Sequence, residues 1–228
     1  MTWVKICGMT NLEDALVAVE AGADAVGFVF YEKSPRCVTV ETAREIVAKL
    51  PESVEKIGVF AGVSMENAVP ASLEAGLDAI QVYPMTHKPQ TNGGVRVSGR
   101  SGLKLYLALP ITVFLGEGNS DVVEFSQQRS GGAFDTLFLD SANSQQPGGT
   151  GRAFDWHKAS SAVKELTLHR RIVIAGGLTP ENVNEALEVL NPFGVDVVSG
   201  VEASPGKKDP EKVRAFVRAV READQKVS

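Results

Sequence analysis

The chain has 228 residues, of which 43% are hydrophobic and 22% charged, with a formal net charge of -5 at pH 7. This is enough chain to bury one large core. The negative balance disfavours a nucleic-acid-binding surface. With no apolar run of about 18 residues and no secretory leader pattern, the sequence predicts a cytoplasmic protein with no membrane partner.

The two cysteines, Cys7 and Cys37, are too few for a disulfide framework. None of the three histidines (His87, His157 and His169) follows a predicted strand or stands at metal-ligand spacing. The sequence also lacks a nucleotide-binding glycine fingerprint. We therefore expect no metal and no organic cofactor.

One short unit occurs three times in the chain. Its copies are Ala-Gly-Ala-Asp-Ala-Val at 21–26, Ala-Gly-Leu-Asp-Ala-Ile at 75–80 and, more loosely, Phe-Gly-Val-Asp-Val-Val at 193–198. Each copy predicts the end of a helix, a glycine just after it and the start of an apolar parallel strand. Such repeats indicate a chain built from βα units.

Taken in chain order, near-continuous runs of Val, Ile, Leu and Phe predict strands that are covered on both faces. They are Trp3–Ile6, Ala25–Phe30, Lys56–Phe60, Ala79–Val82, Leu103–Leu109, Thr136–Leu139, Arg171–Ala175 and Val195–Val198.

Capping residues predict where the intervening helices begin. The helices are Leu12–Val19 after Asn11, Val40–Leu50 after Thr39, Met65–Leu73 after Ser64, Pro180–Leu190 after Thr179 and Pro210–Ala223 after Asp209, and Asp155 is expected to cap another. Proline, at Pro180 and Pro210, suits the first position of a helix.

This alternation predicts an α/β fold of the (β/α)₈ TIM-barrel type, formed as one domain by residues 1–228. A doubly wound open sheet is the alternative. Residues 83–102 show no helical period, so the fourth helix is expected to be short or missing. Residues 142–151 are expected to form a loop.

In such a barrel, function lies at the carboxyl ends of the strands. The first strand ends at Cys7, and Lys5 points to the same side. An ammonium beside a thiol favours the thiolate. The alternatives are that Cys7 is a small buried hydrophobic residue and that Lys5 pairs with a carboxylate.

Three further strand ends carry polar groups. Arg36 follows the second strand and could bind a carboxylate, or lie solvated at the surface. Gln81 and Tyr83 share a face of the fourth strand and could close the barrel with hydrogen bonds. Asp140 follows a fully apolar strand, where a carboxylate is costly unless it is paired or used, although it could also bond loop amides.

Glycines follow the last two strands, at Gly176, Gly177 and Gly200, the last beside Ser199. Loops at this place in barrels often bind phosphate, although tight turns required by packing are the alternative. Two titratable groups, Cys7 and Asp140, would then face one pocket, which suits general acid–base chemistry.

These residues resemble the phosphoribosylanthranilate isomerase family of tryptophan biosynthesis. The matching stretches are Val4–Met9, Asp24–Phe30, Ser34–Arg36, Asp140, Gly148–Gly151, Phe154–Trp156, Ala175–Leu178 and Ser199–Glu202. They span most of the chain in the right order.

The resemblance implies an Amadori rearrangement of N-(5′-phosphoribosyl)anthranilate, a small phosphoribosyl substrate, in a monomer or homodimer. It implies Cys7 as general base and Asp140 as general acid. It also implies that Arg36 binds the anthranilate carboxylate and that the Gly176–Gly177 and Ser199–Gly200 loops hold phosphate. We further expect Lys5 and Gln81 to bind the substrate. One departure stands at Gln81–Pro84, where the family usually has Gln-Leu-His-Gly.

Other functions compete with this one. The sister isomerase of histidine biosynthesis uses an aspartate at the end of its first strand, so Cys7 argues against it. The catalytic lysines and glutamates of indole-3-glycerol phosphate synthase are not matched. A non-catalytic phosphate-binding barrel would not need both Cys7 and Asp140, and a redox-sensing Cys7 would need Cys37 as its partner.

Overall fold

The computed structural model describes residues 1–83, 102–116, 134, 136–141 and 153–227. Within them, eight parallel strands form a closed barrel in sequence order, and β1 pairs with β8 to close it. The strands are β1 (Trp3–Cys7), β2 (Ala25–Val29), β3 (Glu55–Ala61), β4 (Ala79–Tyr83), β5 (Lys104–Pro110), β6 (Thr136–Asp140), β7 (Arg171–Ala175) and β8 (Gly194–Val197). The predicted (β/α)₈ barrel is therefore confirmed.

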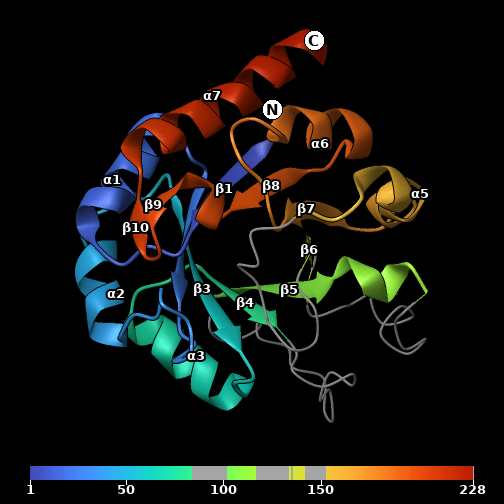
Figure 1. The fold of residues 1–228 in the computed structure, drawn as a ribbon. Helices are drawn as coiled ribbons and strands as arrows, with labels where there is room; N and C mark the ends of the chain where they lie inside the picture. The colour runs from blue at the N-terminus through green and yellow to red at the C-terminus, as the bar shows by residue number, and fades with distance from the viewer. Residues whose placement is uncertain (84–101, 117–133, 135, 142–152, 228) are drawn as a thin grey trace.

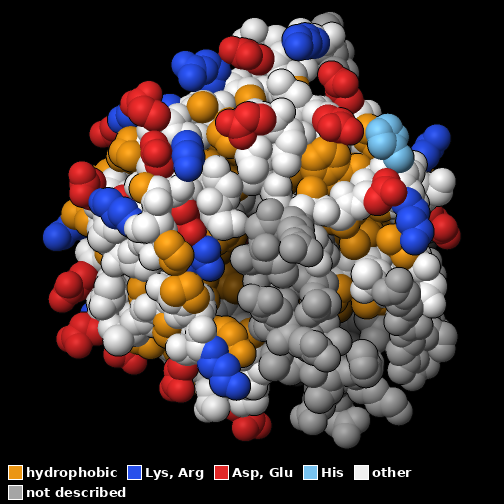
Figure 2. Space-filling view, in the orientation of Figure 1, with side chains coloured by type: hydrophobic (Ala, Val, Ile, Leu, Met, Phe, Trp, Pro, Cys, Tyr) orange, Lys and Arg blue, Asp and Glu red, His pale blue; other side chains and the backbone are white. Residues whose placement is uncertain are grey.

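Helices cover the outside of the barrel, and α1 and α7 pack side by side where the two ends of the chain approach (Figure 1). The helices are α1 (Leu12–Ala21), α2 (Val40–Val47), α3 (Met65–Glu74), α5 (Trp156–Thr167), α6 (Val183–Leu190) and α7 (Pro210–Val227). Short 3₁₀ turns follow two strands, η2 (Ile111–Phe114) and η3 (Ser199–Val201), and a small hairpin follows η3, formed by β9 (Glu202–Ser204) and β10 (Lys207–Lys208). Figure 2 shows charged side chains of both signs interspersed over these helices. Among the described helices, none has the length and apolar character needed to span a bilayer.

The core has two layers because side chains alternate across each strand. In β1, Val4 and Ile6 join the large apolar cluster between strands and helices. Lys5 instead points into the barrel, where it contacts Gln81 and Asp196. A smaller apolar cluster that includes Ala25, Ile57, Ala79, Tyr106, Ala108, Phe138 and Val173 packs separately from the outer layer.

Most predicted helix caps are confirmed by side-chain hydrogen bonds. Asn11, Thr39 and Asp155 each accept a bond from the backbone N–H three residues later. Asp209 accepts from two N–H groups at the start of α7. Ser64 precedes α3 as expected but makes no side-chain capping bond.

The predicted start of α6 at Pro180 is wrong, because that helix begins at Val183. Asn182 Oδ1 accepts a bond from the Thr179 N–H, and Asn182 Nδ2 donates to the Gly177 carbonyl. These two bonds hold residues 179–182 in a turn that follows the β7 loop. The predicted end of α2 at Leu50 is also late, because that helix ends at Val47.

The repeated glycine follows a helix end in two copies only. Gly22 and Gly76 have left-handed backbones after α1 and α3. In the third copy, Asn191 is the left-handed residue (φ 43°), and Gly194 is the first residue of β8. A Cβ on Gly194 would lie 2.6 Å from the Trp3 carbonyl oxygen, so close strand packing explains this glycine. The expectations for a fourth helix within 83–102 and for a loop at 142–151 fall almost wholly outside the described residues.

Candidate active site

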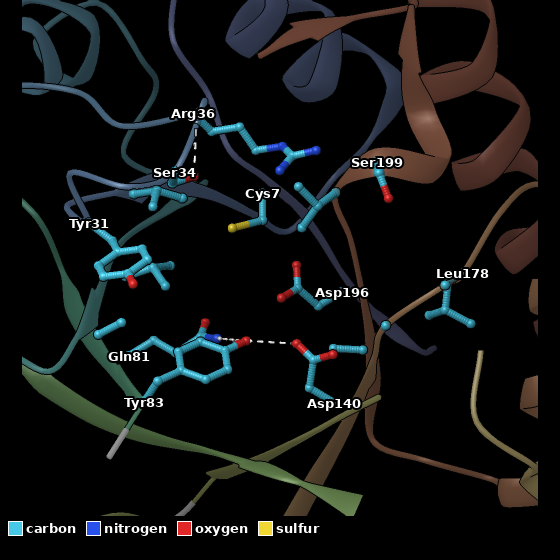
Figure 3. A pocket seen from close by; sticks show the side chains of 17 residues that line it. Cys7, Tyr31, Ser34, Arg36, Gln81, Tyr83, Asp140, Leu178, Asp196 and Ser199 are labelled. Atoms are coloured by element: carbon cyan, nitrogen blue, oxygen red, sulfur yellow. Dashed lines mark hydrogen bonds between the residues drawn. The ribbon is translucent and has the colours of Figure 1, made fainter. Parts of the chain in front are cut away.

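A pocket opens at the carboxyl ends of the strands, and Figure 3 shows side chains converging on it from different strands. It brings together most of the predicted site residues: Cys7, Arg36, Gln81, Asp140, Gly176, Gly177 and Ser199. The other two predicted residues, Lys5 and Gly200, do not line it. Tyr83 and Asp196 line the pocket although the sequence analysis did not assign them to the site.

Lys5 lies beneath the pocket, fully buried. Its Nζ donates to Asp196 Oδ2 at 2.8 Å and to Gln81 Oε1 at 3.0 Å. The sequence left open whether Lys5 serves a thiol or a carboxylate, and its ion pair is with Asp196. The other carboxylate oxygen, Asp196 Oδ1, is buried and has no hydrogen-bond partner among the described residues. A hydroxyl group of a ligand in the pocket could donate to it.

Cys7 is also buried, with 4% of its surface exposed. Burial raises the pKa of its thiol, and nearby Asp196 adds to this, although Lys5 acts to lower it. The expected influence of Lys5 therefore has the right sign, but burial outweighs it. For Lys5 itself, burial acts to lower the pKa, yet Asp196 and Cys7 together raise it. Lys5 thus stays a cation below the thiol.

Asp140 ends β6 with only 3% of its surface exposed. Its Oδ2 accepts a hydrogen bond from the Tyr83 hydroxyl at 3.0 Å, and Gln81 Nε2 donates to that hydroxyl oxygen at 3.4 Å. Ser141 Oγ lies 3.4 Å from Asp140 Oδ1. The predicted role of Gln81 and Tyr83 in hydrogen bonds across the barrel top is therefore confirmed, and one of these bonds reaches the candidate acid.

Arg36 is held by a second carboxylate. Its Nε and Nη2 donate to the two oxygens of Glu202 at 2.8 and 2.7 Å. Lys208 Nζ also reaches Glu202 at 3.2 Å. Burial acts to raise the pKa of Glu202, but these cations hold it below its usual value, so the carboxylate stays charged. Arg36 is consequently anchored at the pocket rim rather than solvated, with Nη1 left for another acceptor.

The glycines after β7 and β8 permit close approach of neighbouring segments. A Cβ on Gly176 would collide with Ser141 Oγ and would lie 2.7 Å from Asp140 Oδ1. A Cβ on Gly200 would collide with the Leu178 carbonyl oxygen. Packing therefore explains both Gly176 and Gly200, but Gly176 also lines the pocket, together with Gly177 and Ser199, whereas Gly200 does not.

Comparison with known protein families agrees with a pocket that holds a thiol and a carboxyl group. The family described as N-(5′-phosphoribosyl)anthranilate (PRA) isomerase matches residues 4–219 of the chain. This chain belongs to the PRA isomerase family. The PRA isomerase of Rubrobacter xylanophilus is 43% identical over 97% of this chain and 100% of its own length.

Solved structures of PRA isomerases share the fold. The enzyme from Thermotoga maritima is 36% identical, with a TM-score of 0.80 over 97% of this chain and 100% of that one. A PRA isomerase in complex with reduced 1-(o-carboxyphenylamino)-1-deoxyribulose 5-phosphate is also 36% identical, with a TM-score of 0.75 over the same shares.

Three residues of this PRA isomerase family member were missed as site residues: Asp196, Tyr83 and Glu202. Asp196 had a usable signal, because a carboxylate between Val195 and Val197 in an apolar strand is costly unless it is paired. For Tyr83 and Glu202 the sequence placed each at a strand end but gave no indication of which partner each would meet. Among the described residues, no group of three or more His, Cys, Asp and Glu side chains is arranged to hold a metal ion.

Proposed function

We propose that this chain isomerises N-(5′-phosphoribosyl)anthranilate to 1-(2-carboxyphenylamino)-1-deoxyribulose 5-phosphate in tryptophan biosynthesis, with Cys7 as base and Asp140 as acid. The observation that carries the proposal is that one pocket is lined by both a thiol from β1 and a carboxyl group from β6. Membership of the PRA isomerase family along residues 4–219 supports the choice of reaction.

The first chemical step opens the furanose ring. Protonated Asp140 gives its proton to the ring oxygen, the C1′–O bond breaks, and the nitrogen lone pair forms a C1′=N iminium ion. A carboxyl group with 3% exposure is shielded from water, which favours direct proton transfer to the substrate.

The second step moves a proton from carbon. The Cys7 thiolate removes the C2′ proton, whose acidity the iminium ion raises, and the electron pair forms a C1′=C2′ enol while neutralising the nitrogen. Tautomerisation then transfers a proton to C1′ and gives the ketone at C2′. Cys7 forms no covalent bond to the substrate. Lys5, buried below, stabilises the thiolate by charge.

The two ends of the substrate require different contacts. Arg36, anchored by Glu202, offers Nη1 to the anthranilate carboxylate. The phosphate fits the loops after β7 and β8, where Gly177 and Ser199 line the pocket, as barrels commonly bind phosphate there. Lys5 acts from beneath the site, Gln81 forms part of the pocket wall, and Gly176 and Gly200 shape the loops. Because monomers of the dimeric Thermotoga maritima enzyme have been solved, we expect either a monomer or a homodimer here.

The fluorescence of the anthranilate substrate should fall as the enzyme consumes it, which provides the assay. We expect Cys7→Ala and Asp140→Asn each to lower kcat by about 10²–10⁴-fold. Both variants should still bind a product analogue. Near-normal turnover by either variant would remove that residue from its role.

Matched controls separate chemistry from folding. Cys37→Ala removes the other thiol, and Asp155→Asn changes a carboxylate that caps α5. Both controls should keep wild-type turnover. Wild-type protein that binds inorganic phosphate but never turns over the substrate would instead indicate a non-catalytic phosphate-binding barrel.

A further inference from the structure

Tyr83 connects the fourth strand to the candidate acid. It is the last residue of β4, and its backbone pairs with Ala61 of β3. Its ring lines the pocket, and its hydroxyl donates to Asp140 Oδ2 at 3.0 Å. Figure 3 marks this bond between the two labelled side chains. β5 lies between β4 and β6 in the barrel, so this bond crosses the pocket between non-adjacent strands.

The direction of the hydrogen bonds follows from Lys5. An ammonium group can only donate, so the Gln81 group that lies 3.0 Å from Lys5 Nζ must be its carbonyl oxygen. The amide nitrogen of Gln81 therefore faces Tyr83, and it too can only donate. The Tyr83 oxygen accepts from Gln81, and its own proton is directed to Asp140. The bonds thus run in one direction, from Lys5 through Gln81 and Tyr83 to Asp140.

Tyr83 stays a neutral donor throughout the working pH range. Burial raises the pKa of its hydroxyl well above 10, and the negative charges of Asp140, Asp196 and Cys7 act in the same direction. It can therefore neither replace Asp140 as the acid nor lose the proton that it donates.

We propose that Tyr83 is a positioning residue for Asp140: by donating to Oδ2, it keeps the acidic proton of Asp140 on Oδ1 and fixes the plane of the carboxyl group. This inference rests on the proposed role of Asp140 as acid. A carboxyl group that accepts at one oxygen carries its proton on the other, so the bond selects which oxygen delivers the proton. The Ser141 hydroxyl donates to Oδ1 at 3.4 Å when Asp140 is ionised, and because a hydroxyl can also accept, it can turn to receive the Oδ1 proton when Asp140 is protonated.

A purely structural role for Tyr83 makes a different prediction. If the bond only closed the barrel top, its loss would lower stability and leave the protonation of Asp140 unchanged. If Tyr83 donates to Asp140, its loss removes stabilisation of the carboxylate, and Asp140 keeps its proton to higher pH.

The experiment uses Tyr83→Phe, which removes only the hydroxyl, in the full-length protein. The Asp140 carboxyl group is followed by carbon-13 NMR of labelled aspartate, with Asp140→Asn identifying its signal. We expect its titration midpoint to rise by about 0.5–1 pH unit. We also expect kcat to fall about 3–10-fold, with KM changed less than about threefold.

Tyr106→Phe is the matched control, because the Tyr106 hydroxyl donates to Glu55 at 2.7 Å and its ring is also buried. This control should leave the Asp140 midpoint and kcat unchanged. An unmoved midpoint in Tyr83→Phe, or an equal shift in both variants, would overturn the inference. If Asp140→Asn keeps turnover, the proposed function fails instead, and the two failures are therefore distinguishable.

Discussion

Asp24 and Asp78 lie at the amino-terminal end of the barrel, whereas Asp196, the aspartate of the third repeat copy, lies inside it. The first two side chains are 41% and 44% exposed, and each accepts a bond from the backbone N–H of the second residue of the preceding strand, Val4 in β1 and Lys56 in β3. The Asp196 side chain is 3% exposed and pairs with Lys5. The same sequence unit therefore supplies a strand cap in two places and a pocket carboxylate in the third.

The difference comes from where each strand begins. Asp24 and Asp78 come just before β2 and β4, but Asp196 is the third residue of β8 because that strand already starts at Gly194. A carboxylate on the residue just before a strand meets water and backbone amides, while one on the inward face of the strand meets the barrel interior. An aspartate in the interior requires a cation, and Lys5 of neighbouring β1 supplies it.

Asp196→Asn should show the largest effect on stability. Losing this charge leaves the Lys5 ammonium buried without its counter-ion, which costs about 3–5 kcal/mol when a buried pair is broken. Urea unfolding with the midpoint and slope both fitted is the measurement. The double variant with Lys5→Met should lose less than the sum of the two single variants, and simple additivity would contradict coupling of this pair.

Gly27→Ala should have the next largest effect on stability. Its new Cβ would lie 2.5 Å from Cys7 Sγ and 3.0 Å from Lys5 Cε. Overpacking of this kind costs about 1–3 kcal/mol, and here it would also displace the thiol and reduce turnover. Gly58→Ala is the matched control, since its Cβ would crowd Phe60 and Leu77 at 2.7 and 2.8 Å, neither of which lines the pocket. Equal losses of turnover in both variants would show that the crowding of Cys7 is not specific.

The protonation of Cys7 tests how the buried charges of Lys5 and Asp196 act inside the barrel. Because burial raises the pKa of the Cys7 thiol, the midpoint of its titration to thiolate should lie at a higher pH than that of an exposed cysteine. Lys5→Met should move the midpoint up, because a stabilising cation is lost, and Asp196→Asn should move it down. Thiolate absorbance in a Cys37→Ser background measures each midpoint, and shifts of the same sign in both variants would contradict the assignment.

Asp78→Asn should have the smallest effect. The carboxylate is 44% exposed, and its ion pair with Lys56 Nζ is long, at 3.6 Å, unlike the 2.8 Å pair of Lys5 with Asp196. Its Oδ2 also accepts from the Lys56 N–H at 2.8 Å, a bond that an amide oxygen can accept as well. We expect a loss below about 1 kcal/mol and unchanged turnover. Thermal unfolding alongside Asp196→Asn gives a direct comparison of the same substitution, and equal losses would mean that position within the strand is unimportant.

The sequence predicted the order of the strands and most of the site because both depend on local pattern. Apolar runs marked all eight strands, and the rule that function lies at strand ends selected Cys7, Arg36 and Asp140, which line one pocket. The start of α6 was missed because Asn182, rather than Thr179, organises that turn through bonds to the β7 loop. The periodicity of apolar residues in a helix does not predict such side-chain hydrogen bonds to a loop.

The sequence by itself determined that this protein is a barrel of βα units with a thiol and a carboxyl group at strand ends. It did so because strand and helix periods and the polarity of strand ends are local properties. Only the tertiary structure decided the pairs: Lys5 with Asp196, Arg36 with Glu202, and Tyr83 with Asp140. These partners are from 57 to 191 residues apart, and only the folding of the chain into the barrel brings them within hydrogen-bonding distance.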